Sequence, residues 1–181
     1  MKDVSDEKIR TYLADSTHFE KGFRLLMQKY QERLYWHIRR MVTQHADAND
    51  VIQNTFIKVY KNIHRFEGKS ELYTWLYRIA TNETLSFLKK RARQSTNPID
   101  GELSNVVNTL KADSYWDEAA AQEKLTNALS ALPNKQRLVF NMRYYDEMSY
   151  QQISEVLETS VGALKANYHH AVKKIERFIR N

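Results

Sequence analysis

The sequence predicts an all-α protein made of two small helical domains joined by a flexible linker. Apolar residues recur at intervals of three and four along most of the chain, which is the spacing of one helix face. Only 4 Gly and 2 Pro occur among 181 residues, too few for a turn-rich β architecture. The periodicity disappears over residues 94–117, so the expected domains are 1–93 and 118–181.

The distribution of charged residues follows a similar division, with two basic segments on either side of an acidic one. Residues 1–93 carry 18 basic and 11 acidic side chains, and residues 121–181 carry nine basic and six acidic ones. The bridge, 94–120, has one Lys against five acids, and the whole chain has a net charge of +6. A basic balance of this kind favours a polyanionic partner such as nucleic acid.

Several classes of function are disfavoured by composition. The chain has no Cys, which excludes disulfides and thiolate chemistry, and its six His show no metal-ligand spacing with carboxylates. The sequence contains neither a Gly-rich phosphate loop nor a nucleophile motif. We therefore expect no catalytic residue, no metal and no cofactor. Because no apolar run approaches the roughly 18 residues that cross a bilayer, we expect a cytoplasmic protein without membrane insertion.

The N-terminal domain is predicted to be a bundle of three or four helices. One long amphipathic helix covers about residues 17–43. Asp47 is expected to cap the next helix, with Asp50 adding favourable charge to its positive end. A loop at residues 67–70 then precedes a third helix that ends in a basic run at residues 89–93.

The C-terminal domain shows a helix-turn-helix pattern. Ser149 and Gln152 have the spacing of a capping box at the start of a short helix, and Ser160 can cap the longer helix that follows. At 100° per residue, one face of that longer helix points away from the apolar stripe. It presents Gly162, Ala163, Lys165, Ala166, His169, His170 and Lys173. Periodicity alone leaves open an ordinary helical hairpin with a solvated face.

A family resemblance favours DNA binding over the plain hairpin. The stretch Ala-Leu-Pro-Asn-Lys-Gln-Arg-Leu-Val-Phe at residues 131–140, followed by Arg143-Tyr144-Tyr145, resembles region four of extracytoplasmic-function sigma factors. In that family the last helix binds the −35 promoter element. The resemblance implies −35 contacts by Arg143, Ser160, Gly162, Lys165, Ala166, His169, His170 and Lys173. Ala163, Ala166 and His170 depart from the residues that the family usually has at these positions.

The N-terminal domain resembles the same family in two segments. Residues 47–60, Asp-Ala-Asn-Asp-Val-Ile-Gln-Asn-Thr-Phe-Ile-Lys-Val-Tyr, are similar to the region that docks on the clamp helices of polymerase's largest subunit. The resemblance implies that polymerase binds through Asp47, Asp50, Gln53, Asn54 and Ile57. The family commonly has Glu where Asn49 stands.

Residues 66–82 resemble the segment with which the family opens promoters. Unpaired bases bind by stacking on aromatic side chains, while nearby basic residues neutralise the phosphates. A loop can also form a pocket for one flipped base. The implied −10 contacts are Phe66, Glu67, Gly68, Lys69, Ser70, Leu72, Asn82, Lys89, Lys90 and Arg91.

The resemblance implies a sigma factor rather than an enzyme. Its expected partners are core RNA polymerase (the largest and second-largest subunits), promoter DNA and an anti-sigma factor. A stand-alone helix-turn-helix regulator is the alternative, but it would leave the N-terminal motifs unexplained.

Overall fold

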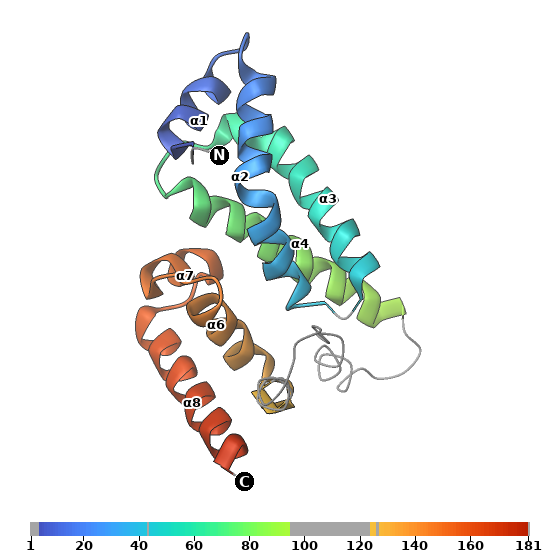
Figure 1. The fold of residues 1–181 in the computed structure, drawn as a ribbon, viewed down its shortest axis with the longest axis vertical. Helices are drawn as coiled ribbons and strands as arrows, with labels where there is room; N and C mark the ends of the chain where they lie inside the picture. Colours follow the sequence, from blue (N-terminus) through green and yellow to red (C-terminus); the bar gives the residue numbers. More distant parts are fainter. Residues whose placement is uncertain (1–3, 43, 95–123, 126, 181) are drawn as a thin grey trace, which may run out of the picture.

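The computed structural model describes residues 4–42, 44–94, 124–125 and 127–180, and every regular element in these ranges is a helix. The all-α prediction is confirmed. The N-terminal half contains α1 (Asp6–Ala14), α2 (Phe19–Arg39), α3 (His45–Asn62), a 3-10 turn η1 (Ile63–Arg65) and α4 (Leu72–Gln94). The C-terminal half contains α6 (Asn134–Tyr144), α7 (Tyr150–Leu157) and α8 (Val161–Arg180), as Figure 1 shows. The predicted linker, 94–117, lies almost wholly outside the described residues.

The apolar stripes of the N-terminal half meet in one core. Leu26, Leu34 and Ile38 of α2 are fully buried, and they belong to one cluster with residues of α3 and α4. The partners from α3 and α4 include Val51, Phe56, Val59, Leu76 and Ala80. The predicted bundle is therefore present, with three long helices sharing the burial.

Helix α1 packs against α2 at a glycine. A Cβ added at Gly22 would lie 2.9 Å from Cβ of Tyr12 and from the backbone N of Leu13, so a side chain here would separate the two helices. Ser5 caps α1 by accepting a hydrogen bond from the Lys8 amide at 3.3 Å. Periodicity did not predict this helix.

The start of α3 differs from the prediction. The helix begins at His45 and its N-cap is Gln44, whose backbone is extended, so Asp47 lies within the first turn. The predicted N-cap role of Asp47 is wrong, because its carboxylate instead forms an ion pair with Arg91. A negative charge in a first helical turn still interacts favourably with the helix dipole.

The helix-turn-helix at the C-terminus has the predicted caps. Ser149 Oγ accepts from the Gln152 amide at 3.2 Å, and the Gln152 side chain accepts from the Ser149 amide at 2.8 Å. The second helix is capped by Ser160, whose Oγ accepts from the Ala163 amide at 3.4 Å. Between them, Glu158 ends α7 in the left-handed conformation, at φ 51°.

The two halves pack directly on each other. Helix α7 lies against α4, and the larger core cluster includes Met148, Ile153 and Val156 of the C-terminal half together with the N-terminal core (Figure 1). A second, smaller cluster joins α6, α8 and the segment before α6, through residues such as Leu129, Phe140 and Ile175. Within the described ranges, no helix is both long and apolar enough to span a bilayer.

Candidate polymerase and nucleic-acid interfaces

Helix α3 presents a polar stripe to solvent. Asp50, Gln53, Asn54 and Ile57 are all exposed, and they follow the spacing of a single helix face. Ile57 is 52% exposed, whereas the other large aliphatic residues of α3 are buried. The structure thus brings four of the five predicted polymerase-binding residues onto one accessible surface.

The fifth residue, Asp47, lies at the end of this stripe, where α3 meets the C-terminal end of α4. Asp47, Asp50, Gln53 and Asn54 line a hollow of about 490 Å³. Its other wall comes from Phe87, Lys90, Arg91 and Gln94 of α4. Residues predicted for polymerase binding and for −10 DNA binding therefore share one surface depression.

The loop before α4 is built around an aromatic pair. The rings of Phe66 and Trp75 lie 5.3 Å apart, and the Arg10 guanidinium sits 5.6 Å from the centre of the Phe66 ring. Gly68 has a φ of 73°, a left-handed conformation that favours glycine. Lys69 pairs with Glu67 at the exposed edge of the loop. Arg10 is a member of this site that sequence reasoning missed, because local sequence does not reveal that α1 packs beside this loop.

The other predicted −10 residues are not all gathered at this loop. Leu72 is 2% exposed, so it supports the loop from the core and offers almost no surface to a base. Asn82 is exposed but lies ten residues further along α4, about 15 Å along the helix axis. Lys89 and Lys90 are exposed further on still. The predicted −10 site is therefore an extended track along α4 rather than a single pocket.

The predicted groove-binding face of α8 is fully accessible. Gly162, Ala163, Lys165, Ala166, His169, His170 and Lys173 are all exposed. A Cβ added at Gly162 would meet nothing within 4 Å, so the first turn of the helix is open to an approaching phosphate. The helix N-terminus, the basic residues and the free space together form a surface suited to duplex DNA.

Tyr150 anchors two of the predicted DNA contacts. The Arg143 guanidinium lies 5.5 Å from the centre of its ring and also donates a hydrogen bond to the Met148 carbonyl at 3.0 Å. Lys165 Nζ lies 5.9 Å from the same ring. Arg143 therefore braces the turn before α7, while its exposed surface remains available to a phosphate.

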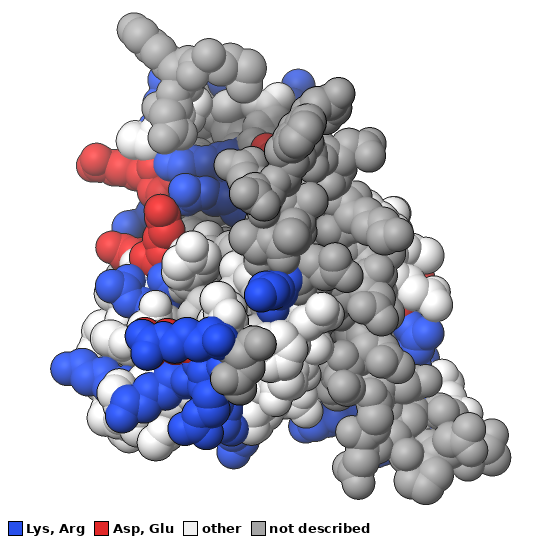
Figure 2. Space-filling view, turned by 60° about the horizontal axis from the view of Figure 1, so that its bottom comes forward, with Lys and Arg blue, Asp and Glu red and all other residues white. Residues whose placement is uncertain are grey.

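Positive charge gathers at the end of the molecule where α8 finishes, as Figure 2 shows. The exposed basic residues of this helix are Lys165, Lys173, Lys174, Arg177 and Arg180, and Glu176 is its one acid. Such a surface attracts a polyanion before any specific contact forms.

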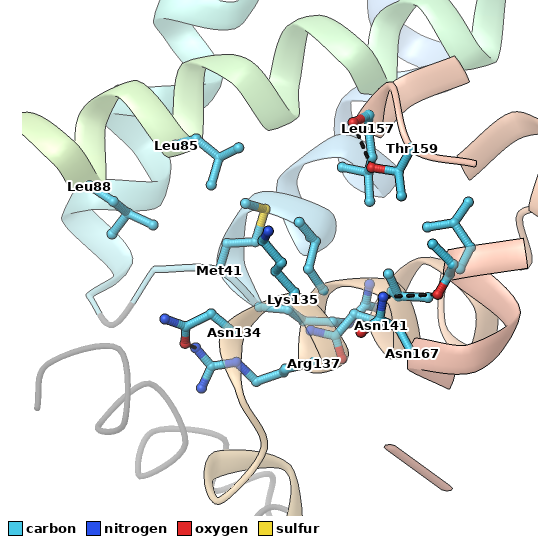
Figure 3. A pocket seen from close by; sticks show the side chains of 15 residues that line it. Met41, Leu85, Leu88, Asn134, Lys135, Arg137, Asn141, Leu157, Thr159 and Asn167 are labelled. Carbon is cyan, nitrogen blue, oxygen red and sulfur yellow. Dashed lines mark hydrogen bonds between the residues drawn. The ribbon is translucent and has the colours of Figure 1, made fainter. Parts of the chain in front are cut away.

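A pocket of about 420 Å³ lies between the two halves (Figure 3). Met41, Leu85 and Leu88 form its N-terminal side, and residues of α6 and α8 form the other. Arg137 is 5% exposed, and its Nη1 has no hydrogen-bond partner within the described part of the chain. Burial lowers the pKa of this guanidinium below its usual value. Sequence periodicity gave no sign of this pocket, because it requires both domains.

Two family models match the chain. Sigma-70 region 2 matches residues 26–94, and Sigma-70, region 4 matches residues 122–175. The "ECF RNA polymerase sigma-E factor" of Haemophilus influenzae is 31% identical over 169 residues, covering 89% of each chain. Its namesake in Escherichia coli K12 is 29% identical over 169 residues, covering 89% of this chain and 88% of its own.

Two solved structures share the fold. The sigma factor RpoE of Bartonella quintana, solved with the anti-sigma factor NepR, aligns with a TM-score of 0.73 at 21% identity. That alignment covers 88% of this chain and 98% of RpoE. CnrH, solved with the cytosolic domain of CnrY, aligns with a TM-score of 0.69 at 21% identity and covers 97% of both chains.

Proposed function

The chain belongs to the extracytoplasmic-function sigma factors of the sigma-70 family. From this membership we propose which of its surfaces binds polymerase, which binds the −10 element and which binds the −35 element. It is a non-enzymatic subunit that binds RNA polymerase and directs transcription initiation. The observation that carries this function is the presence of both regions, in order, in one chain that matches its relatives almost end to end.

The polymerase-binding surface is the exposed stripe of α3, with Asp50, Gln53, Asn54 and Ile57 as its main contacts and Asp47 at its edge. One exposed aliphatic residue among polar neighbours supports this assignment, because interfaces combine an apolar centre with a polar rim. The partner surface is the clamp-helix region of the largest subunit.

The −10 element is bound along α4 and the loop before it. Phe66 and the left-handed turn at Gly68 support capture of an unpaired base, since an aromatic face and an open backbone are the parts that capture requires. Asn82 contacts DNA further along the helix. Lys89 and Lys90 neutralise phosphates there, joined by Arg91 when it leaves Asp47.

The −35 element is bound by α8. Lys165, Ala166, His169, His170 and Lys173 face the major groove, and the Ser160–Gly162 end approaches a phosphate. The domains that perform these tasks are 1–93 and 118–181, with 94–117 as the acidic linker. The protein works in the cytoplasm and binds an anti-sigma factor, as RpoE of Bartonella quintana does in its complex with NepR.

Run-off transcription tests the proposal. Core polymerase of the same organism is supplied with DNA from upstream of the gene, with this protein or without it. We expect discrete transcripts that require the protein and that disappear when either the −10 or the −35 element of the mapped promoter is replaced. Absence of transcripts, together with absence of core binding in a pull-down, would instead support the stand-alone regulator.

A further inference from the structure

A hollow of about 670 Å³ lies between α1 and the segment that leads into the loop before α4. Arg10, Thr11 and Ala14 line it from α1, and Ile63, His64 and Phe66 line it from the other side. The family model for Sigma-70 region 2 begins its match at residue 26, after α1 has ended. The −10 contacts implied by the resemblance begin at Phe66, so the α1 wall of this hollow has no assigned role.

The guanidinium of Arg10 rests on the loop before α4 at two points. Its central carbon lies 5.6 Å from the centre of the Phe66 ring. A Cβ added at Gly68 would lie 2.7 Å from Nη2 and 3.4 Å from Cζ of Arg10, so the guanidinium also lies against the Gly68 backbone. Phe66 in turn contacts Trp75, with ring centroids 5.3 Å apart. Arg10 is exposed whereas Phe66 and Trp75 are partly buried, so Arg10 is the member of this group that an incoming ligand meets first.

The N–H groups of Arg10 are available to a ligand. Among the described residues, none of the ion pairs and none of the hydrogen bonds involves its side chain. A guanidinium carries five N–H donors in one plane, so its face can stack on a ring while its edge donates to a phosphate. A guanidinium that lies over an aromatic ring and has no protein acceptor is therefore suited to nucleic acid.

The hollow beside Arg10 suits a base better than a phosphate. Thr11, Ala14 and Ile63 give it small or apolar walls, and the exposed ring of His64 offers a further flat surface. Glu7 also lines the hollow, and its carboxylate would repel a phosphate but not an uncharged base. Unpaired bases stack on aromatic side chains and on the plane of an Arg guanidinium.

We propose that α1 carries part of the −10 site, in which Arg10 contacts the unpaired strand and the adjacent hollow receives one nucleotide. This site rests on the proposed function, because it requires the loop before α4 to bind the −10 element as a single strand. The base stacks beside the Arg10 guanidinium, and the edge of that group donates to a neighbouring phosphate. By resting on Gly68, Arg10 also supports the turn that captures the flipped base.

Binding of a single strand to the holoenzyme tests the contact by Arg10. The full-length protein is assembled with core polymerase, and fluorescence anisotropy follows binding of a labelled non-template strand of the mapped −10 element at several salt concentrations. We expect Arg10→Ala to weaken binding about tenfold and to reduce the slope of log affinity against log salt by about 0.7. Circular dichroism would show that the variant is folded.

Lys8→Ala is the matched control for this substitution. Lys8 is exposed on the same helix and does not line the hollow, and it lies about 200° around the helix axis from Arg10. Its removal deletes the same positive charge, so it should change the affinity and the salt slope much less than Arg10→Ala does.

The salt slope separates a direct contact from a purely structural role of Arg10. Loss of support for the loop would lower affinity but leave the slope unchanged, because no phosphate contact would disappear. Arg10→Lys keeps the charge without the planar group, so it should restore the slope but only part of the affinity. The contact would be overturned if Arg10→Ala matched Lys8→Ala, or if it lost affinity at an unchanged slope.

A cross-link from the hollow tests the site without changing Arg10. Because the chain has no Cys, a photoreactive group can be attached specifically at Thr11→Cys, which lines the hollow, or at Lys8→Cys, which does not. The holoenzyme is assembled on promoter DNA, and permanganate reactivity verifies that the DNA is open. We expect Thr11→Cys to cross-link to the non-template strand within or directly beside the −10 element, and Lys8→Cys to give far less product.

Failure of the −10 assignment and failure of the α1 site give different results. If the holoenzyme with the original protein neither binds the −10 strand nor opens the promoter, the assignment of the loop is wrong, and the site on α1 is wrong with it. If open complexes form but Thr11→Cys gives no more product than Lys8→Cys, only the site on α1 is overturned.

Discussion

Arg91, near the end of α4, forms an ion pair with Asp47 in the first turn of α3. The family resemblance assigns Asp47 to polymerase and Arg91 to DNA, yet the two side chains neutralise each other in the free protein. Because the Asp47 side chain is 14% exposed and that of Arg91 is 41% exposed, the pair lies partly out of solvent. The polymerase surface and the −10 surface are therefore coupled at this point.

This pair predicts an unequal salt dependence for neighbouring cations. Each phosphate contact contributes about 0.7 to the slope of log affinity against log salt for single-stranded DNA. We expect Lys90→Ala to reduce that slope by about this amount. Arg91→Ala should reduce it less, because Arg91 must first leave Asp47, and Asp47→Asn should strengthen binding. Fluorescence anisotropy with a labelled −10 strand measures all three; equal losses for Lys90→Ala and Arg91→Ala would contradict the coupling.

Charge reversal on the α3 stripe should weaken polymerase binding without unfolding the protein. Asp50→Lys changes an exposed residue, so we expect the free energy of unfolding to stay within about 0.5 kcal/mol of the original. Core affinity should fall at least tenfold, which surface-immobilised polymerase would report. Glu32→Lys makes the same charge change on α2 and serves as control. Normal core affinity in Asp50→Lys would remove α3 from the interface.

Two lysines of α8 separate groove binding from general attraction. Lys165 lies on the predicted groove face, and Lys174, nine residues on, lies about half a turn around the helix. Lys165→Ala should cost about 1–3 kcal/mol of −35 binding, whereas Lys174→Ala should cost much less. Both variants lose one positive charge, so a footprint and an affinity that respond equally to the two would argue against specific contact by Lys165.

Tyr73 gives the protein a dependence on alkaline pH. Burial raises the pKa of its phenol to about 12, above the ordinary value of 10. The neutral form is thus favoured in the folded state, and its stabilisation is complete below pH 10 and lost as pH rises towards 12. Allowing for solvent screening, we expect a loss of at most about 1 kcal/mol by pH 11.

Urea unfolding of the original protein and of Tyr73→Phe at pH 8, 10 and 11 measures this effect. The original should lose more stability than Tyr73→Phe over the upper interval, because phenylalanine has no proton to release. Parallel curves for the two proteins would show that Tyr73 titrates normally.

The local features of this fold could be predicted from sequence, and the contacts between domains could not. The Ser149–Gln152 box and the apolar stripes of the long helices depend on neighbours three and four residues apart. The side chain of Asp146 is buried against His37 and Arg40, which lie 109 and 106 positions away along the chain. Nothing periodic marks such a pairing.

The candidate sites show the same division. Helical geometry predicts which face of α8 is exposed, and the residues of that face are exposed in the structure. The family resemblance implies DNA contact by Leu72, but the side chain of Leu72 fills the core beneath the loop. The sequence of helix α1 does contain a typical helix start, since Ser5 is followed by Asp6 and Glu7 in the first turn. Its contribution to the loop through Arg10 appears only once the helices are packed.

Two glycines should respond oppositely to alanine. At Gly68 the backbone has a φ of 73°, and a Cβ would lie 2.7 Å from Nη2 of Arg10. Gly68→Ala should therefore cost about 1–2 kcal/mol of stability from the backbone alone and displace Arg10 from Phe66. At Gly162 the surroundings are open, and alanine should stabilise α8 by up to about 1 kcal/mol.

The effects of these two substitutions on DNA binding and promoter opening should differ from their effects on stability. Gly162→Ala adds bulk where the helix end is proposed to approach a phosphate, so −35 binding should weaken although the protein becomes more stable. Gly68→Ala should leave −35 binding intact and reduce promoter opening, which permanganate reactivity of unpaired thymines reports. Thermal unfolding and duplex binding measured on both variants separate these effects. Full −35 affinity in Gly162→Ala would place the phosphate away from the first turn of α8.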